Sequence, residues 1–196
     1  QQMSNYFSAL GRVSYRVFKA DPKSAIAKAE EHIRKNSKKR FELVVFDFPG
    51  HAGTSDLLEL SLEMDYILSP IEADVQSMVS CLAYAKTMQD LGVSMTGARI
   101  KDVMLLWNKV DRRVKSTLIE KYSEYIRNEG YTLFDEHVYA AHRFCHELEQ
   151  YGFRGAFRST YLAPGKALRV GTGLDEMIDS LLTHIRLKKE ADNGTD

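Results

Sequence analysis

The stretch Val103-Met104-Leu105-Leu106-Trp107, followed by Asn108-Lys109-Val110-Asp111, decides the class of fold. A run of apolar residues that stops abruptly at polar ones is typical of a strand buried on both faces of a parallel sheet. Residues 41–46 (FELVVF) show the same pattern and end at Asp47-Phe48-Pro49-Gly50, which is a sharp turn signal. The sequence therefore predicts two buried strands, each followed by a polar turn.

Helical patterns separate the predicted strands. We expect further strands at residues 15–18, 66–68 and 131–134, and helices at residues 22–33, 55–63, from 74 or 77 to about 91, 118–130, 141–151 and 174–187. Asp74 or Ser77 could cap the long third helix. This alternation predicts an α/β fold with a mainly parallel sheet flanked by helices. We assign residues 1–190 to a single domain and residues 191–196 to a polar tail.

Composition excludes several classes of protein. The 196 residues carry 27 basic and 27 acidic side chains, so no global field points to nucleic acid or an anionic membrane. Only Cys81 and Cys145 are present, which indicates reduced thiols and a cytoplasmic location. No apolar run approaches the roughly 20 residues that cross a bilayer, so we expect no membrane partner.

The segment Asp47-Phe48-Pro49-Gly50 (the DFPG segment) is the first candidate site. Ligands bind beyond the carboxyl ends of strands in such sheets. A carboxylate like that of Asp47 can hold Mg²⁺ there, directly or through water. Gly50 would let a backbone amide approach a phosphate closely. The alternative is an ordinary strand-terminating turn, because Asp, Pro and Gly are turn formers.

The segment Asn108-Lys109-Val110-Asp111 (the NKVD segment) is the second. In nucleotide switches an Asn at this place hydrogen-bonds the base, and Asp111 could accept from a guanine edge. The alternative is a helix start with Asp111 as its cap. The two segments lie in the right order, about sixty residues apart, with one strand and helix between them. This arrangement favours a nucleotide switch.

On these segments the chain resembles the ParA/MinD family of deviant P-loop ATPases, and within it the TraA-type transfer proteins of Bacteroides conjugative transposons. Residues 65–74 resemble the family's strand that ends at a proline before a long helix. Residues 157–160 ahead of Pro164 resemble the loop that closes over adenine. A GTPase is the alternative, because DxxG followed by NKxD is its pattern. However, no Ser-Ala-Lys follows the strand at residues 131–134.

The resemblance implies a P-loop NTPase-like fold and a nucleotide-dependent switch in conjugative transfer or partition of mobile DNA. It implies that Mg-ATP is the cofactor and that Asp47 is the metal ligand. Partners would be a second copy in a homodimer, non-specific DNA and proteins of the transfer machinery. The nucleotide-contacting residues would be Asp47, Pro49, Gly50, Asn108, Asp111 and Pro164.

The phosphate-binding loop of that family, K-G-G-x-G-K-S/T, does not occur in the sequence. We therefore expect this chain alone not to hydrolyse ATP, and we assign it no catalytic residue. Loss of the N-terminal strand and loop by truncation is the simplest explanation, and a non-catalytic interaction module is the alternative. In the family that strand lies in the middle of the sheet, beside the strand ending at Asp47. The sequence thus predicts a rearranged sheet or a gap filled by another chain.

Overall fold

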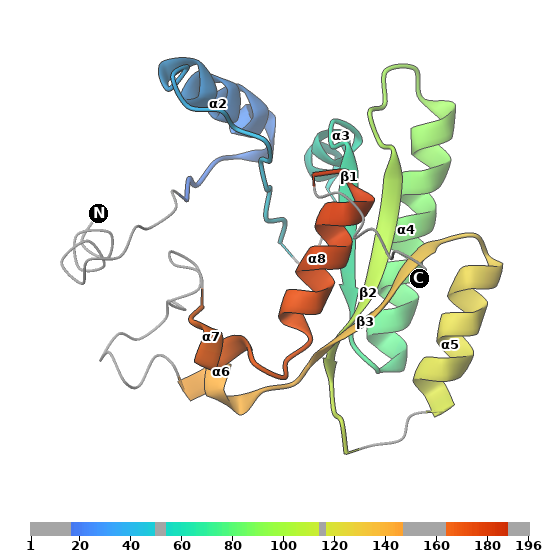
Figure 1. Cartoon of the computed structure of the whole chain (residues 1–196). Coiled ribbons are helices and arrows are strands. Elements are labelled where there is room, and N and C mark those ends of the chain that lie inside the picture. The colour runs from blue at the N-terminus through green and yellow to red at the C-terminus, as the bar shows by residue number, and fades with distance from the viewer. Residues whose placement is uncertain (1–16, 50–53, 114–116, 147–163, 188–196) are drawn as a thin grey trace, which may run out of the picture.

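The computed structural model describes residues 17–49, 54–113, 117–146 and 164–187. Within these residues, three parallel strands form one sheet in the order β1 (Tyr66–Ile71), β2 (Asp102–Val110) and β3 (Thr132–Tyr139) (Figure 1). All of β1 pairs with β2, in a register that sets Tyr66 opposite Asp102. The predicted α/β class, with a parallel sheet flanked by helices, is confirmed.

Helices cover both faces of the sheet (Figure 1). Helices α4 (Val75–Ser94) and α5 (Thr117–Asn128) pack on one face, and α8 (Leu174–His184) packs on the other. Helix α3 (Ser55–Leu62) contacts α4 and also α2 (Pro22–Lys35). Two short helices, α6 (His142–His146) and α7 (Lys166–Arg169), follow β3. None of the described helices is both long and apolar enough to span a membrane.

Strand β2 is the centre of the core. Residues 103–107 are all buried, and their side chains alternate between the two faces, as the sequence predicts. Trp107 is fully buried on the α4 and α5 face, where its indole N–H donates to Ser123 Oγ at 2.8 Å. A buried polar group needs such a partner, so this hydrogen bond fixes α5 against the sheet.

The boundaries of several elements differ from the prediction, and β3, for example, continues from Thr132 to Tyr139. Asp74 caps α4 as expected, since its Oδ1 accepts from the backbone N–H of Ser77 at 2.8 Å, but the helix continues to Ser94. Strand β1 continues through Pro70 to Ile71, although we expected proline to stop it. Pro70 is tolerated because β1 is an edge strand of the described sheet, where a missing N–H interrupts no ladder.

The prediction of a buried strand at residues 41–46 is wrong. The segment is irregular, and its apolar side chains except the half-buried Phe46 are exposed, with Val45 at 78% and Leu43 at 48%. An apolar run becomes a strand only where a neighbouring strand satisfies its backbone groups. No strand of the described sheet lies beside this one. The strand predicted at residues 15–18 is also not formed at Val17 and Phe18, while residues 15–16 lie outside the described residues.

Candidate functional site

The NKVD segment lies at the carboxyl end of the central strand. Asn108, Lys109 and Val110 are the last residues of β2, and only Asp111 lies beyond it. The strand is longer than predicted because Val110 pairs with Tyr139 of β3, and the Val110 carbonyl accepts from the N–H of Ala140 at 3.0 Å. Asp111 does not cap α5, which begins at Thr117. The interpretation of this segment as a helix start is therefore wrong.

Lys109 adopts an unusual backbone conformation. Its φ is 53°, in the left-handed region that residues with a side chain rarely occupy. Its Nζ lies 2.5 Å from Glu72 Oε1, just after the end of β1. Backbone strain of this kind often occurs at functional sites, and the ion pair joins the carboxyl ends of the two neighbouring strands.

The carboxylate of Asp111 is held by Arg113. Oδ1 accepts from the backbone N–H and the Nε of Arg113, both at 3.0 Å, and Oδ2 accepts from its Nη2 at 2.7 Å. The side-chain hydrogen bonds, followed by the backbone one, lower the pKa of Asp111 from 3.8 to about 2. A guanine edge would have to displace Arg113 to use this carboxylate.

The residues of the DFPG segment lie in a different environment. Asp47 and Pro49 are exposed in irregular chain, and Gly50 lies outside the described residues. Among the described residues, no hydrogen bond or ion pair links Asp47 to Asn108 or Asp111, and no three His, Cys, Asp or Glu side chains gather as a metal site would require. The described residues thus do not bring Asp47 to the NKVD segment, and we derive no reaction step through Mg-ATP.

Pro164 lies at the start of the C-terminal part. Its carbonyl accepts from Arg169 Nη1 at 3.2 Å, which closes the turn ahead of α7. Residues 157–160, the predicted adenine loop, lie outside the described residues. The structure therefore brings Asn108 and Asp111 to one strand end but shows no bond from Pro164 to either of them.

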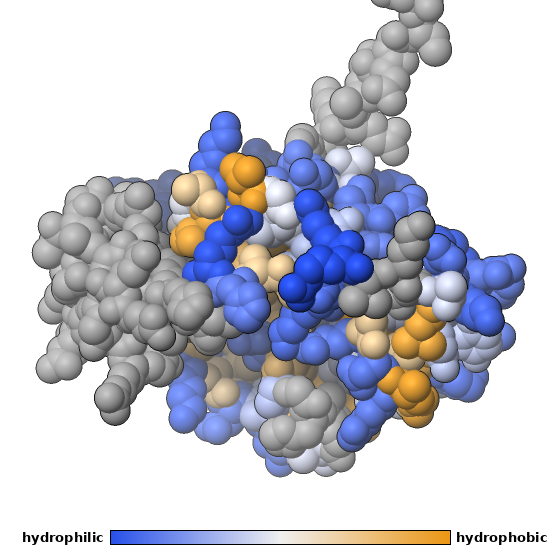
Figure 2. Space-filling view, turned by 90° about the horizontal axis from the view of Figure 1, so that it is seen from below, coloured by the Kyte–Doolittle hydropathy of each residue, from blue (hydrophilic) through white to orange (hydrophobic). Residues whose placement is uncertain are grey.

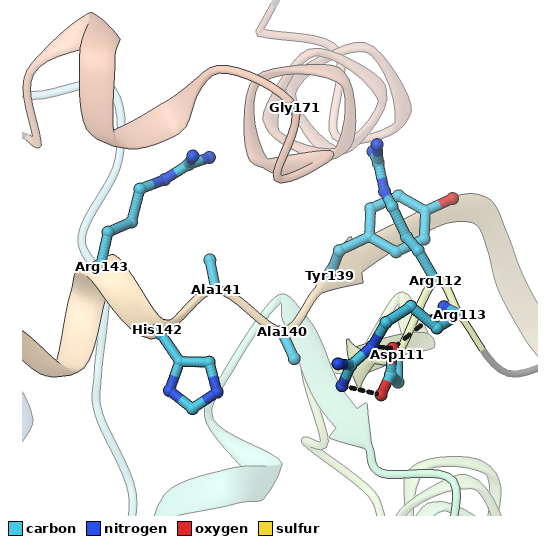
Figure 3. A pocket seen from close by; sticks show the side chains of 9 residues that line it. All are labelled: Asp111, Arg112, Arg113, Tyr139, Ala140, Ala141, His142, Arg143 and Gly171. Carbon is cyan, nitrogen blue, oxygen red and sulfur yellow. Dashed lines mark hydrogen bonds and ion pairs between the residues drawn. The ribbon is translucent and has the colours of Figure 1, made fainter.

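A cavity of about 410 Å³ opens at the carboxyl ends of β2 and β3 (Figure 3). Its lining comes from the chain after β2, the end of β3, the start of α6 and the turn before α8, and includes Asp111, Arg112, Arg113, Tyr139, Arg143 and Gly171. Figure 2 shows strongly hydrophilic side chains gathered near the middle of this end of the molecule. Its size is within the range of small-molecule sites.

The turn before α8 is fixed against β3 by a close backbone contact. The N–H of Tyr139 donates to the Thr172 carbonyl at 2.8 Å. Gly173 has a φ of 73°, and a Cβ at this position would lie 2.0 Å from the carbonyl oxygen of His137. Only glycine fits both the conformation and the space. This contact places Gly171 at the rim of the cavity.

Most of the cavity lining was not predicted from the sequence. Arg112 and Arg113 directly follow the NKVD segment, so their position was visible in the pattern. Tyr139 and Arg143 come from β3 and α6, and only the pairing of β2 with β3 brings them to the same place. Comparison with protein-family models, with curated proteins and with solved structures found no match to this chain.

Proposed function

We propose that this chain is the base-binding part of a ParA-type nucleotide switch that acts in transfer or partition of mobile DNA. The observation that carries the proposal is the position of the NKVD segment at the carboxyl end of the central strand β2. In parallel sheets this end is where nucleotides bind. Asn108 would contact the base there. The P-loop NTPase fold is part of the same proposal.

Two unpaired features of the described residues support the proposal that a phosphate-binding part completes the sheet. Within the described residues β1 pairs only with β2, so its outer edge is unpaired. The apolar segment 41–46 is exposed and also unpaired. An additional strand that carries the phosphate loop would satisfy both, since exposed strand edges and strand-forming apolar segments attract each other. Asp47 would then be the Mg²⁺ ligand.

The contact between Asp111 and Arg113 favours adenine over guanine. Guanine recognition needs a carboxylate that accepts hydrogen bonds, and both oxygens of Asp111 accept from Arg113. We therefore prefer an ATPase to a GTPase. The intact protein would be cytoplasmic, would dimerise when ATP binds, and would contact DNA and proteins of the transfer machinery.

The reading frame upstream of residue 1 provides the first test. A K-G-G-x-G-K-S/T segment after a short apolar strand is expected there. A frame without it would favour the interaction module instead.

Nucleotide competition on the chain extended by that segment provides the second test. We expect ATP with Mg²⁺ to displace a fluorescent nucleotide and GTP to compete poorly. Asn108→Ala should weaken ATP binding three- to tenfold, the value of about one hydrogen bond. Asn128→Ala, at the exposed end of α5, is the matched control. Equal or better competition by GTP would contradict the assignment.

A further inference from the structure

The cavity at the ends of β2 and β3 concentrates positive charge in a chain whose formal net charge is zero. Three guanidinium groups, from Arg112, Arg113 and Arg143, line it together with a single carboxylate. Arg113 neutralises that carboxylate, Asp111, through two side-chain hydrogen bonds. The charges of Arg112 and Arg143 are therefore left uncompensated within the lining.

Arg112 is held by an aromatic ring. Its guanidinium carbon lies 3.8 Å from the ring centroid of Tyr139, which is a cation–π contact. Among the described residues, no carboxylate forms an ion pair with Arg112. Stacking uses only the face of the guanidinium group, so the N–H donors along its edge remain available to a ligand.

Arg143 stands on the other side of the cavity and is fixed by the backbone (Figure 3). Its Nε donates to the carbonyl of Leu168 at 2.8 Å, and its Nη2 donates to the carbonyl of Val170. In the described part of the chain, Arg143 also lacks a carboxylate partner. A guanidinium group has five N–H donors, so others remain for a ligand.

The space between the two arginines is left open by small residues. Ala140 and Ala141 lie between Tyr139 and Arg143 along the chain, and Gly171 lies opposite them (Figure 3). None of these three residues has a side chain longer than a methyl group. Two positioned guanidinium groups, without a carboxylate partner among the described residues, thus face one cavity, which an oxyanion would complete.

We propose that this cavity binds a phosphate-bearing small molecule, with the phosphate group held between Arg112 and Arg143. Planar guanidinium groups match the oxygens of a phosphate in bidentate geometry. This site goes beyond the proposed nucleotide switch, because it needs neither Asp47 nor a phosphate loop. It is a property of the chain as it stands.

Titration calorimetry of the full chain with pyrophosphate tests the proposal. We expect saturable binding that weakens as salt is raised, since the contacts are exposed and charged. Arg112→Gln and Arg143→Gln should each lower the affinity about tenfold or more, and Arg112→Lys should fall between wild type and Arg112→Gln. Arg127→Gln is the matched control, because Arg127 is an exposed arginine of α5 that pairs with Asp135 and does not line the cavity.

Thermal melting of each variant separates a lost site from a lost fold, which matters most for Arg143 because it also donates to the carbonyls of Leu168 and Val170. ATP and inorganic phosphate are compared with pyrophosphate to find the source of the phosphate group. Equal affinities indicate that the phosphate alone is bound, and tighter ATP binding that Arg112→Gln abolishes indicates a nucleotide. Asn128→Ala, at the exposed end of α5 and outside the cavity lining, should leave pyrophosphate binding unchanged. Absence of binding to the wild type, or binding that neither arginine variant weakens, overturns the proposal.

Discussion

Lys109 Nζ lies 2.5 Å from Glu72 Oε1, and this ion pair joins the carboxyl ends of β2 and β1. Lys109 reaches Glu72 from a left-handed backbone conformation, with a φ of 53°. Both side chains are largely exposed, at 63% and 46%, so the attraction contributes only about 0.2–1 kcal/mol. Since the left-handed conformation costs about 1–2 kcal/mol, the ion pair alone does not explain it.

Substitution of Lys109 should separate the strain from the ion pair. Lys109→Ala loses the ion pair but keeps the strained φ, so we expect a loss of about 0.2–1 kcal/mol in the free energy of unfolding. Lys109→Gly also relieves the strain and should be about 1 kcal/mol more stable than Lys109→Ala. Urea denaturation of both variants measures the difference. If the glycine variant were less stable than the alanine variant, position 109 would not have the left-handed backbone conformation seen in the structure.

Ser123→Ala should destabilise the protein by about 1–3 kcal/mol, because it leaves the buried indole N–H of Trp107 without an acceptor. Trp107 is the single tryptophan, so its fluorescence follows unfolding in urea directly. Ser80→Ala, on the exposed side of α4, is the control and should change the stability by less than about 0.5 kcal/mol. Equal effects of the two substitutions would show that the hydrogen bond is unimportant.

Gly171 and Gly173 form a matched pair for testing the turn before α8. Both have a positive φ, but a Cβ at Gly171 meets no atom within 4 Å, whereas one at Gly173 would lie 2.0 Å from the His137 carbonyl oxygen. Gly171→Ala should therefore cost about 1 kcal/mol from backbone strain alone. Gly173→Ala should cost at least about 2 kcal/mol more, because the backbone must move. Melting temperatures that fall equally would argue against the close contact.

His137 should make stability depend on pH. Burial, followed by repulsion from Arg127, lowers the pKa of His137 from its ordinary value of 6.5. The unfolded chain then binds more protons than the folded one. The stabilisation is complete above about pH 6.5 and is lost as the pH falls through the lowered pKa. His137→Gln should flatten the stability curve between about pH 7 and pH 5, as measured by urea denaturation at a series of pH values.

Val45→Asp should leave the stability of this chain within about 0.5 kcal/mol of the wild type, because the side chain is 78% exposed in irregular chain. Leu105→Ala, in the buried centre of β2, should cost about 2–5 kcal/mol by comparison. Chemical denaturation measures both. A large loss in Val45→Asp would mean that residues 41–46 are packed, as the sequence alone predicted.

The secondary structure predicted from the sequence is confirmed where contacts between neighbouring residues determine it. The five apolar residues 103–107 needed no context to be recognised as a buried strand, and Asp74 caps its helix through a contact only three residues away. The prediction failed at residues 41–46, because an apolar run cannot provide its own strand partner. It also failed at Asp111, whose carboxylate is held by Arg113, two residues further on, and caps no helix.

The candidate site was predictable only in part. The NKVD segment was recognised and lies at a strand end as expected, although its roles in binding ATP remain a prediction. The contact of Arg112 with Tyr139 spans 27 positions of the chain. No local pattern encodes such a contact, because it depends on the register of β2 against β3 and on the irregularities within it.

The sequence by itself determined the α/β class, the parallel order of strands and helices, and the burial of β2, because periodicity and apolar runs act over a few neighbouring residues. Only the tertiary structure decided which apolar segment joins the sheet and which basic side chains meet at its carboxyl end. The physical reason is that strand pairing and charge clustering depend on partners that are distant in sequence. Residues 41–46 stay irregular because no strand of the described sheet pairs with them. Arg112, Arg113 and Arg143 line one cavity only after β3 has paired with β2.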